Sequence, residues 1–170
     1  RRGQNGIILD RVNDSVLYDN DCSFLSGWGL ALWRSSRNLV TRNAFDFCVR
    51  GHVEGVYNRG QDSAGILMFE QCHDNVIAYN SATHGGDGIF MYAGHETTQR
   101  TGTGGCSRNL LYRNDFSHAV ANAIECTFSD GNRFIENTLD DSNYGVWAGY
   151  SYNTKIAGNT CRNARVAGVA

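Results

Sequence analysis

The sequence has no proline, no long apolar run and no surplus of charge of one sign. No hydrophobic stretch reaches the ~20 residues that a helix needs to cross a bilayer, which excludes a helical membrane span. With 15 basic and 17 acidic residues, the chain lacks the broad cationic field of proteins that bind nucleic acid. The 6 cysteines contain no C-x-x-C pair, which argues against a structural zinc site. The composition therefore indicates an ordinary protein surface with no nucleic-acid partner.

Glycine is abundant where proline is missing. The 20 glycines among 170 residues would interrupt long packed helices, whereas short strands joined by tight turns use glycine for positive φ. The length corresponds to one domain, residues 1–170. Because the chain starts without methionine and stops inside a repeat, we expect it to be a piece of a longer protein, with room for an export signal outside it.

A Gly-Ile pair or a close equivalent recurs along the whole chain. Successive pairs are separated by 23, 36, 23, 35, 22 and 23 residues, and they begin at Gly6, Gly29, Gly65, Gly88, Ala123, Gly145 and Gly168. One asparagine series runs in step with them, at Asn20, Asn43, Asn80, Asn114, Asn137 and Asn159. A second series precedes the first by five or six residues, at Asn38, Asn75, Asn109, Asn132 and Asn153. Three series in step indicate an internal repeat.

This repeat predicts an all-β fold, a right-handed parallel β-helix of about seven coils with 22–23 residues each and loop insertions in two of them. The unit is too short for helical-pair repeats and lacks the leucine framework of leucine-rich repeats. In a β-helix, equal residues of adjacent coils stack about 4.8 Å apart into ladders. Asparagine suits such a ladder because it tolerates left-handed backbone and its amide can bond to the next copy. We therefore interpret both asparagine series as structural.

Alternation within the Gly-Ile strands predicts which side chains form the core. The inward set is Ile7, Leu30, Ile66, Ile89, Ile124 and Val146, with Leu9, Leu32, Met68, Met91, Cys126 and Ala148. Cys72 and Cys106 share a ladder position, where a buried thiol stack is preferred over a disulfide.

The outward positions of the same strands carry large aromatic side chains. They include Trp33, Phe69, Phe90, Tyr92 and Trp147, an apolar patch that soluble proteins seldom expose without a use. The two insertions, Ala44–Ala64 and the segment from Met91 to Cys106, are expected at opposite edges of this sheet, on adjacent coils. Aromatic platforms between carboxylates suit sugar rings. The alternative is that the loops cover the aromatics as a satellite core.

Polar residues gather at one edge of the predicted sheet. His84 and His118 each follow a ladder asparagine by four residues, so we expect them to stack, with Asp141 in the same register on the next coil. Asp87 stands at a strand start, and Glu125 replaces an apolar residue in the outward row. A carboxylate in such a row is costly unless it is exposed or paired, which makes Glu125 a candidate functional residue as well as a candidate solvated side chain.

The G-[IV]-x-hydrophobic and N-x-x-x-x-N motifs resemble the right-handed parallel β-helix repeats of the pectate-lyase-like superfamily, especially its carbohydrate-binding and sugar-hydrolase group. The resemblance covers essentially the whole chain. It implies a polysaccharide or oligosaccharide partner and a secreted, cell-surface or periplasmic location. That superfamily also contains lyases, uronan epimerases, copper-enzyme maturation factors and noncatalytic adhesins, so the fold alone does not decide the activity. No complete catalytic motif of polygalacturonases, pectate lyases or mannuronan epimerases is present.

The leading hypothesis is a glycoside hydrolase in which Asp62, Asp87 and Glu125 supply the carboxyl groups. Ideal coil geometry places Asp87 ~11 Å from Glu125 and ~8 Å from Asp62, which mildly favours inversion. The substrate would bind across Trp33, Phe69, Phe90, Tyr92 and Trp147. This chemistry needs no cofactor.

Three alternatives stay open. A lyase or epimerase would use His84, His118 and Tyr92 as proton carriers, with Arg50 or Arg59 as the cation that neutralises a uronate. A noncatalytic surface or stalk module would bind a glycan or a protein through the aromatic strip. A metal-linked periplasmic accessory protein would hold a divalent ion such as calcium between His84, His118 and Asp141. If the ends of the solenoid are uncapped, we also expect end-to-end self-association.

Overall fold

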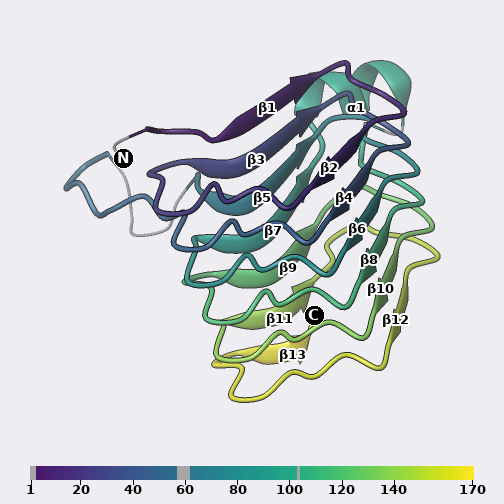
Figure 1. Cartoon of the computed structure of the whole chain (residues 1–170). Helices are drawn as coiled ribbons and strands as arrows, with labels where there is room; N and C mark the ends of the chain where they lie inside the picture. The colour runs from purple at the N-terminus through teal and green to yellow at the C-terminus, as the bar shows by residue number, and fades with distance from the viewer. Residues whose placement is uncertain (1–2, 57–61, 103) are drawn as a thin grey trace.

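The computed structural model describes residues 3–56, 62–102 and 104–170 as a solenoid of parallel strands (Figure 1). Each coil contributes one strand to a seven-stranded sheet, sheet A, and all but the last contribute one to a six-stranded sheet, sheet B. The strands of sheet A are β1 (Ile7–Asp10), β3 (Trp28–Trp33), β5 (Ala64–Phe69), β7 (Asp87–Tyr92), β9 (Asn122–Cys126), β11 (Tyr144–Trp147) and β13 (Ala167–Val169). Those of sheet B are β2 (Val16–Tyr18), β4 (Leu39–Thr41), β6 (Val76–Ala78), β8 (Leu110–Tyr112), β10 (Arg133–Ile135) and β12 (Lys155–Ala157). The predicted parallel β-helix is confirmed.

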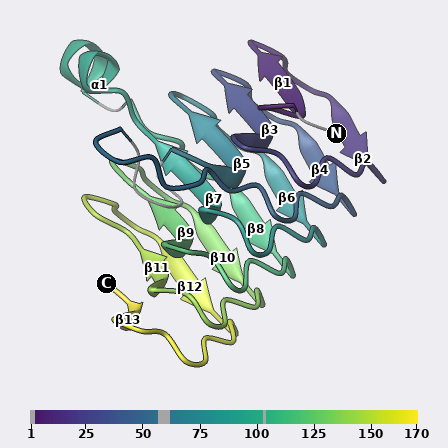
Figure 2. The same cartoon turned by 90° about the vertical axis from the view of Figure 1, so that its left-hand side faces the viewer.

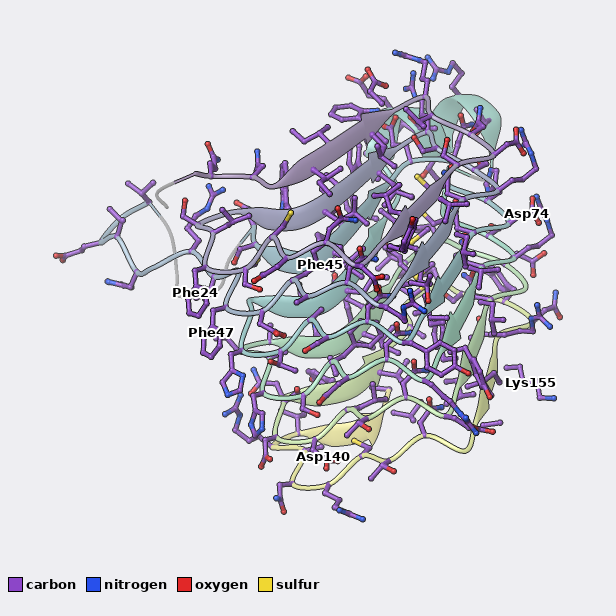
Figure 3. All side chains as sticks on the ribbon, in the orientation of Figure 1. Phe24, Phe45, Phe47, Asp74, Asp140 and Lys155 are labelled. Atoms are coloured by element: carbon purple, nitrogen blue, oxygen red, sulfur yellow. The ribbon has the colours of Figure 1, made fainter. Side chains whose placement is uncertain are left out.

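Sheet register follows the predicted repeat. Ile7 pairs with Leu30, Leu30 with Ile66 and Ile66 with Ile89, so the Gly-Ile pairs of successive coils lie side by side. A third line of contact between coils consists of single bridges, such as Ser81 with Asp115. The predicted inward residues line the interior between the sheets, where Leu30, Leu32, Ile66, Met68, Ile89, Met91, Ile124, Cys126 and Val146 are fully buried. Phe45 lies among them in the interior (Figure 3).

The first asparagine series forms a continuous hydrogen-bonded ladder. In each step the side-chain Nδ2 of one asparagine donates to Oδ1 of the next, as Asn80 does to Asn114 at 3.0 Å. The left-handed residue of this turn is not the asparagine but the residue before it, for example Tyr79 with φ 59° and Arg113 with φ 51°. The expectation that asparagine recurs here because it tolerates left-handed backbone is therefore wrong. Its amide bonds to neighbouring coils are the reason for its recurrence.

The second asparagine ladder contains Asn38, Asn75, Asn109 and Asn132. Asn153 does not belong to it, because Arg133 pairs with Lys155 and this register places Thr154 beside Asn132. Asn153 instead has φ 50° and lies in line with Arg108 and Gly131, which are also left-handed. In the sequence, Asn153 precedes Asn159 by six residues, whereas the other asparagine pairs are five residues apart, and this extra residue indicates the shift.

The two insertions project from opposite ends of the sheet A strands, as predicted. The first projects beyond the beginning of the strands, whereas the second forms α1 (His95–Thr101) beyond their carboxyl ends (Figures 1 and 2). Buried Glu70 holds α1 in place, since its Oε1 accepts from Thr97 Oγ1 at 2.6 Å and its Oε2 from Arg34 at 2.7 Å. The pKa of Glu70 lies below its usual value. Burial alone would raise this pKa, but the hydrogen bonds from Thr97 and Arg34 have the larger combined effect. Within the described residues, no helix is long and apolar enough to cross a membrane.

Cys72 and Cys106 are free, buried thiols stacked on adjacent coils. The Cys72 thiol lies 3.4 Å from the carbonyl oxygen of Leu32, and that of Cys106 lies 3.4 Å from the carbonyl oxygen of Met68. The preferred interpretation of a thiol stack agrees with this geometry.

The repeated glycine of sheet A breaks the alternation of side chains. A Cβ on Gly29 would lie 2.7 Å from Cβ of Phe45, so this position faces the interior, as the following Leu30 also does. Because two consecutive residues face inward, the in–out alternation of side chains shifts by one for the residues that precede the glycine. The residue preceding each glycine, such as Trp28 or Asp87, consequently lies on the outer face of sheet A.

Replacement of Gly88 by alanine is expected to destabilise the fold by roughly 1–3 kcal/mol through overpacking. The added methyl carbon would lie 2.6 Å from Cβ of Phe116 and 2.5 Å from the carbonyl oxygen of Ala123, so backbone must shift. Urea unfolding measures the change. Gly51→Ala is the matched control, because no heavy atom lies within 4 Å of the added carbon there, and equal unfolding midpoints for both variants would contradict the prediction.

Candidate functional site

Two carboxyl groups lie together on the outer face of sheet A. Asp87 begins β7 and Glu125 lies on β9, and both are hydrogen-bonded to Asn122. The backbone N–H of Asn122 donates to Asp87 Oδ1 at 2.8 Å, and its side-chain Nδ2 donates to Glu125 Oε2 at 2.6 Å. We call Asp87 and Glu125 the carboxyl pair.

The first insertion is hydrogen-bonded to the backbone at the start of β7. The backbone N–H of Asp87 donates to the carbonyl oxygen of Ser63 at 3.0 Å, and that of Gly86 donates to the carbonyl oxygen of Cys48 at 3.1 Å. Both ends of the insertion are thus bonded to the start of β7. Asp87 is only 8% exposed, whereas Glu125 is half-buried.

The environment of the pair raises the pKa of both groups. Burial, reinforced by the charge of Glu125, raises the pKa of Asp87 to about 8. Burial also raises the pKa of Glu125, although the hydrogen bond from Asn122 opposes the change. A buried acid that keeps its proton at neutral pH beside a second carboxyl group is suited to proton transfer.

The pH dependence of stability tests this assignment. An unfolded aspartate has a pKa near 4, so between about pH 4 and pH 8 folded Asp87 holds a proton that the unfolded chain has released. Its contribution to stability is fully present below pH 4 and is lost as pH rises to about 8, a loss of up to several kcal/mol. Urea unfolding of Asp87→Asn should show a much weaker decline over this range than the parent protein.

The control for that measurement is Asp74→Asn. The hydrogen bond from Arg108 lowers the pKa of Asp74, so Asp74 contributes stability that is lost as pH falls. Its replacement should leave the decline between pH 4 and pH 8 intact. An Asp87→Asn variant with an unchanged decline would show that Asp87 is ionised in the folded protein.

An apolar groove runs along the outer face of sheet A toward the carboxyl pair. Its volume is about 540 Å³, and its lining consists of Ile8, Trp28, Ala31, Leu32, Trp33, Asp62, Leu67, Phe69, Phe90 and Tyr92. Phe90 pairs in register with Glu125, which in turn pairs with Trp147, so the outward row continues from the groove through the pair. Trp33 is 45% exposed and Trp147 38% exposed. The insertions therefore leave an open groove rather than covering the aromatics completely.

The groove aromatics contact one another. Trp33 meets Phe69 edge to face at 4.6 Å between ring centroids, Phe69 stacks on Tyr92 at 5.3 Å, and Phe90 lies 5.4 Å from Tyr92. Because Phe69 and Tyr92 stack across neighbouring strands, the faces they turn toward each other are occupied. These rings form a wall of the groove, and their use as platforms for sugar rings stays a prediction.

His84 and His118 belong to a ladder at the turn before sheet A, which we call the turn ladder: Phe24, Phe47, His84, His118, Asp141 and Asn163. All six residues have left-handed backbone, with φ between 54° and 61°. Phe24 and Phe47 lie one above the other (Figure 3) and stack at 4.8 Å between ring centroids. Phe47 and His84 stack at 4.7 Å, and His84 and His118 at 4.5 Å. The stacking of the two histidines agrees with the predicted register.

This ladder supplies a structural reason for both histidines. His118 Nδ1 lies 3.6 Å from Asp141 Oδ2, and His84 Nδ1 lies 3.0 Å from Thr83 Oγ1. The His84 ring stacks between Phe47 and His118, and neither histidine forms a hydrogen bond, ion pair or ring contact with the carboxyl pair among the described residues. In the part of the chain that the structure describes, no group of three or more His, Cys, Asp or Glu is arranged to hold a metal ion. The divalent-metal hypothesis thus gains no supporting geometry.

The remaining predicted site residues lie around the groove. Asp62 is exposed, has φ 52° and lines the groove, whereas Tyr92 forms part of its wall. The backbone N–H of Arg50 donates to Ser63 Oγ at 3.0 Å, which places Arg50 at the base of the first insertion. Arg59 lies outside the described residues. The catalytic roles of all these residues stay predictions.

Sequence reasoning missed two contributors. They are Asn122, which bridges the two acids, and Trp28, which lines the groove. The signal for both was the glycine or alanine that follows them, which reverses the face of the strand.

The two sheets, the stacked coils and the outer groove define a parallel β-helix protein. The chain matches the family model described as the right-handed beta helix region over residues 1–161, and it belongs to that family. Comparison with curated proteins gives no match.

Proposed function

We propose that this protein binds a polysaccharide along the apolar groove and hydrolyses it at the carboxyl pair. The observation that carries the proposal is buried Asp87, joined through Asn122 to Glu125, which pairs in register with Phe90 of the groove. Burial raises the pKa of Asp87 to about 8, which suits a proton donor. Many β-helix proteins act on carbohydrates, which agrees with this proposal without specifying a reaction. A depolymerase of this kind would meet its substrate in a secreted, cell-surface or periplasmic location.

The reaction assigns one role to each member of the pair. The Asp87 carboxylic acid donates its proton to the glycosidic oxygen while the bond from that oxygen to the anomeric carbon breaks. The Glu125 carboxylate accepts a proton from a water molecule, whose oxygen forms the new bond to the anomeric carbon. Glu125 ends protonated and Asp87 ionised, and proton exchange with solvent restores both.

A panel of neutral and acidic polysaccharides tests the reaction class. Hydrolysis produces new reducing ends, a lyase produces unsaturated sugars, and an epimerase changes configuration without shortening the chain. Because Glu125 is proposed to activate water rather than to attack the sugar, hydrolysis should invert, and ¹H NMR should show a first product of opposite anomeric configuration. Unsaturated or epimerised products would favour the alternative that uses Tyr92, His84 or His118.

A noncatalytic glycan-binding module is the second candidate, because the groove exists independently of the pair. Binding without any product across the panel would support it. Failure to bind or convert any glycan would contradict both candidates.

A further inference from the structure

The apolar groove offers few hydrogen-bonding groups to a ligand. Among the described residues that line it, Asp62 is the one with a charge, and the indole N–H groups of Trp28 and Trp33 and the hydroxyl group of Tyr92 are the other polar side-chain groups. Its floor is the aliphatic row of Ile8, Ala31 and Leu67. A ligand in this groove must therefore give up water mainly for contacts with carbon.

Unsubstituted sugars fit such a surface poorly. Their hydroxyl groups would lose hydrogen bonds to water without replacement. The usual compensation, an aromatic ring face under the sugar, is reduced because Phe69 and Tyr92 stack on each other. Burial of a methyl group in the groove is favourable, whereas burial of an unpaired hydroxyl group is unfavourable. One methylene group in a hydrophobic pocket changes the preference between two ligands by about tenfold or more.

The groove also runs in a direction that suits a bound glycan chain. It crosses β1, β3, β5 and β7, whose neighbours are about 4.8 Å apart. A sugar residue has a similar length, so a glycan lying across the strands places about one residue on each coil. The outward row of sheet A under this glycan leads from Ile8 through Leu67 and Phe90 to Glu125.

We propose that the substrate is a glycan whose residues carry methyl groups, either as O-acetyl esters or as 6-deoxy sugars, and that these groups fill the groove on the β1 to β7 side of the carboxyl pair. This inference rests on the proposed function. It adds the substrate class, which the carboxyl pair alone does not determine.

Matched substrates separate the two sources of methyl groups. One pair is an O-acetylated glucomannan before and after mild alkaline deacetylation, and the other is a polymer of a 6-deoxyhexose beside the polymer of the corresponding hexose. Binding is measured by affinity electrophoresis with Asp87→Asn, and kcat/KM with the parent protein. We expect at least about a tenfold preference for the methyl-bearing member of at least one pair.

A groove variant links that preference to the floor. Ile8 is 56% exposed, so Ile8→Gln can be made without disturbing the core, and it should reduce the preference several-fold. Val16→Gln is the control, because Val16 is 59% exposed on the outer face of sheet B and should leave the preference unchanged.

The outcomes distinguish the two proposals. Equal cleavage and binding of both members of each pair would overturn the inference and leave the hydrolase standing. Preferential binding of a methyl-bearing glycan without hydrolysis would support the inference and remove the hydrolase. A preference that survives Ile8→Gln would show that the methyl groups bind elsewhere and would also overturn the inference.

Discussion

Replacement of Asp87 by asparagine is expected to lower kcat for polysaccharide hydrolysis by about 10²–10⁴-fold, the usual contribution of a general acid. The amide can still accept the hydrogen bond from the backbone N–H of Asn122, but it has no acidic proton for the leaving oxygen. Binding of the polymer should change little, because the groove is intact. Reducing-end assays and affinity electrophoresis measure the two effects separately.

An activated substrate makes this prediction specific for proton donation. An aryl glycoside with an acidic phenol leaves without protonation, so Asp87→Asn should lose much less activity on it than on the polymer. Glu125→Gln should lose activity on both, because activation of water is needed in each case. Equal losses for Asp87→Asn on both substrates would contradict the role of Asp87 as the acid. Asp62→Asn serves as a comparison on the groove wall.

Replacement of Asn114 by alanine is expected to destabilise the protein by about 3–5 kcal/mol. Its Nδ2 donates to the carbonyl oxygen of Ile77 at 2.9 Å and to Asn137 Oδ1 at 3.0 Å. Its Oδ1 accepts from both the backbone N–H and the side-chain Nδ2 of Asn80. Alanine would leave several buried polar groups without partners, each costing about 1–3 kcal/mol before relaxation.

The control is an asparagine of the turn ladder. Asn163 is exposed, has φ 54° and donates to Asp141 at 3.1 Å. Glycine tolerates this left-handed backbone, which alanine would strain, so Asn163→Gly should change the free energy of unfolding by less than about 0.5 kcal/mol. Urea unfolding compares the two variants. Similar losses at Asn114 and Asn163 would show that stacking of the amides matters less than their effect on the turn.

Much of the fold could be predicted because a β-helix repeats one local solution. A step of 22 or 23 residues places equal side chains on adjacent coils, so Ile66 and Ile89 must meet once the step is known. The lengthened steps likewise placed the two insertions at opposite ends of one sheet. Register also predicted that His84 and His118 would stack, which they do at 4.5 Å.

The site could be predicted only in part, because it depends on departures from the repeat. Strict alternation gives no reason for Asp87 to share a face with Glu125, and ideal geometry separates them by about 11 Å. The inward glycine position between Asp87 and Ile89 brings both acids to the outer face, where Asn122 joins them. Burial on this face raises the pKa of Asp87 to about 8, and no repeat length specifies that burial.

By itself the sequence determined the solenoid, its two asparagine ladders and the edges at which the insertions leave, since each follows from the identity and spacing of repeated residues. The tertiary structure decided which face each nonrepeating side chain occupies and what surrounds it. It assigned the histidines to the turn ladder, turned the aromatics into a wall of an apolar groove and gave Asp87 a buried partner. The physical reason is that desolvation and pairing depend on neighbours from other coils and from an irregular loop, whose positions no repeat length specifies.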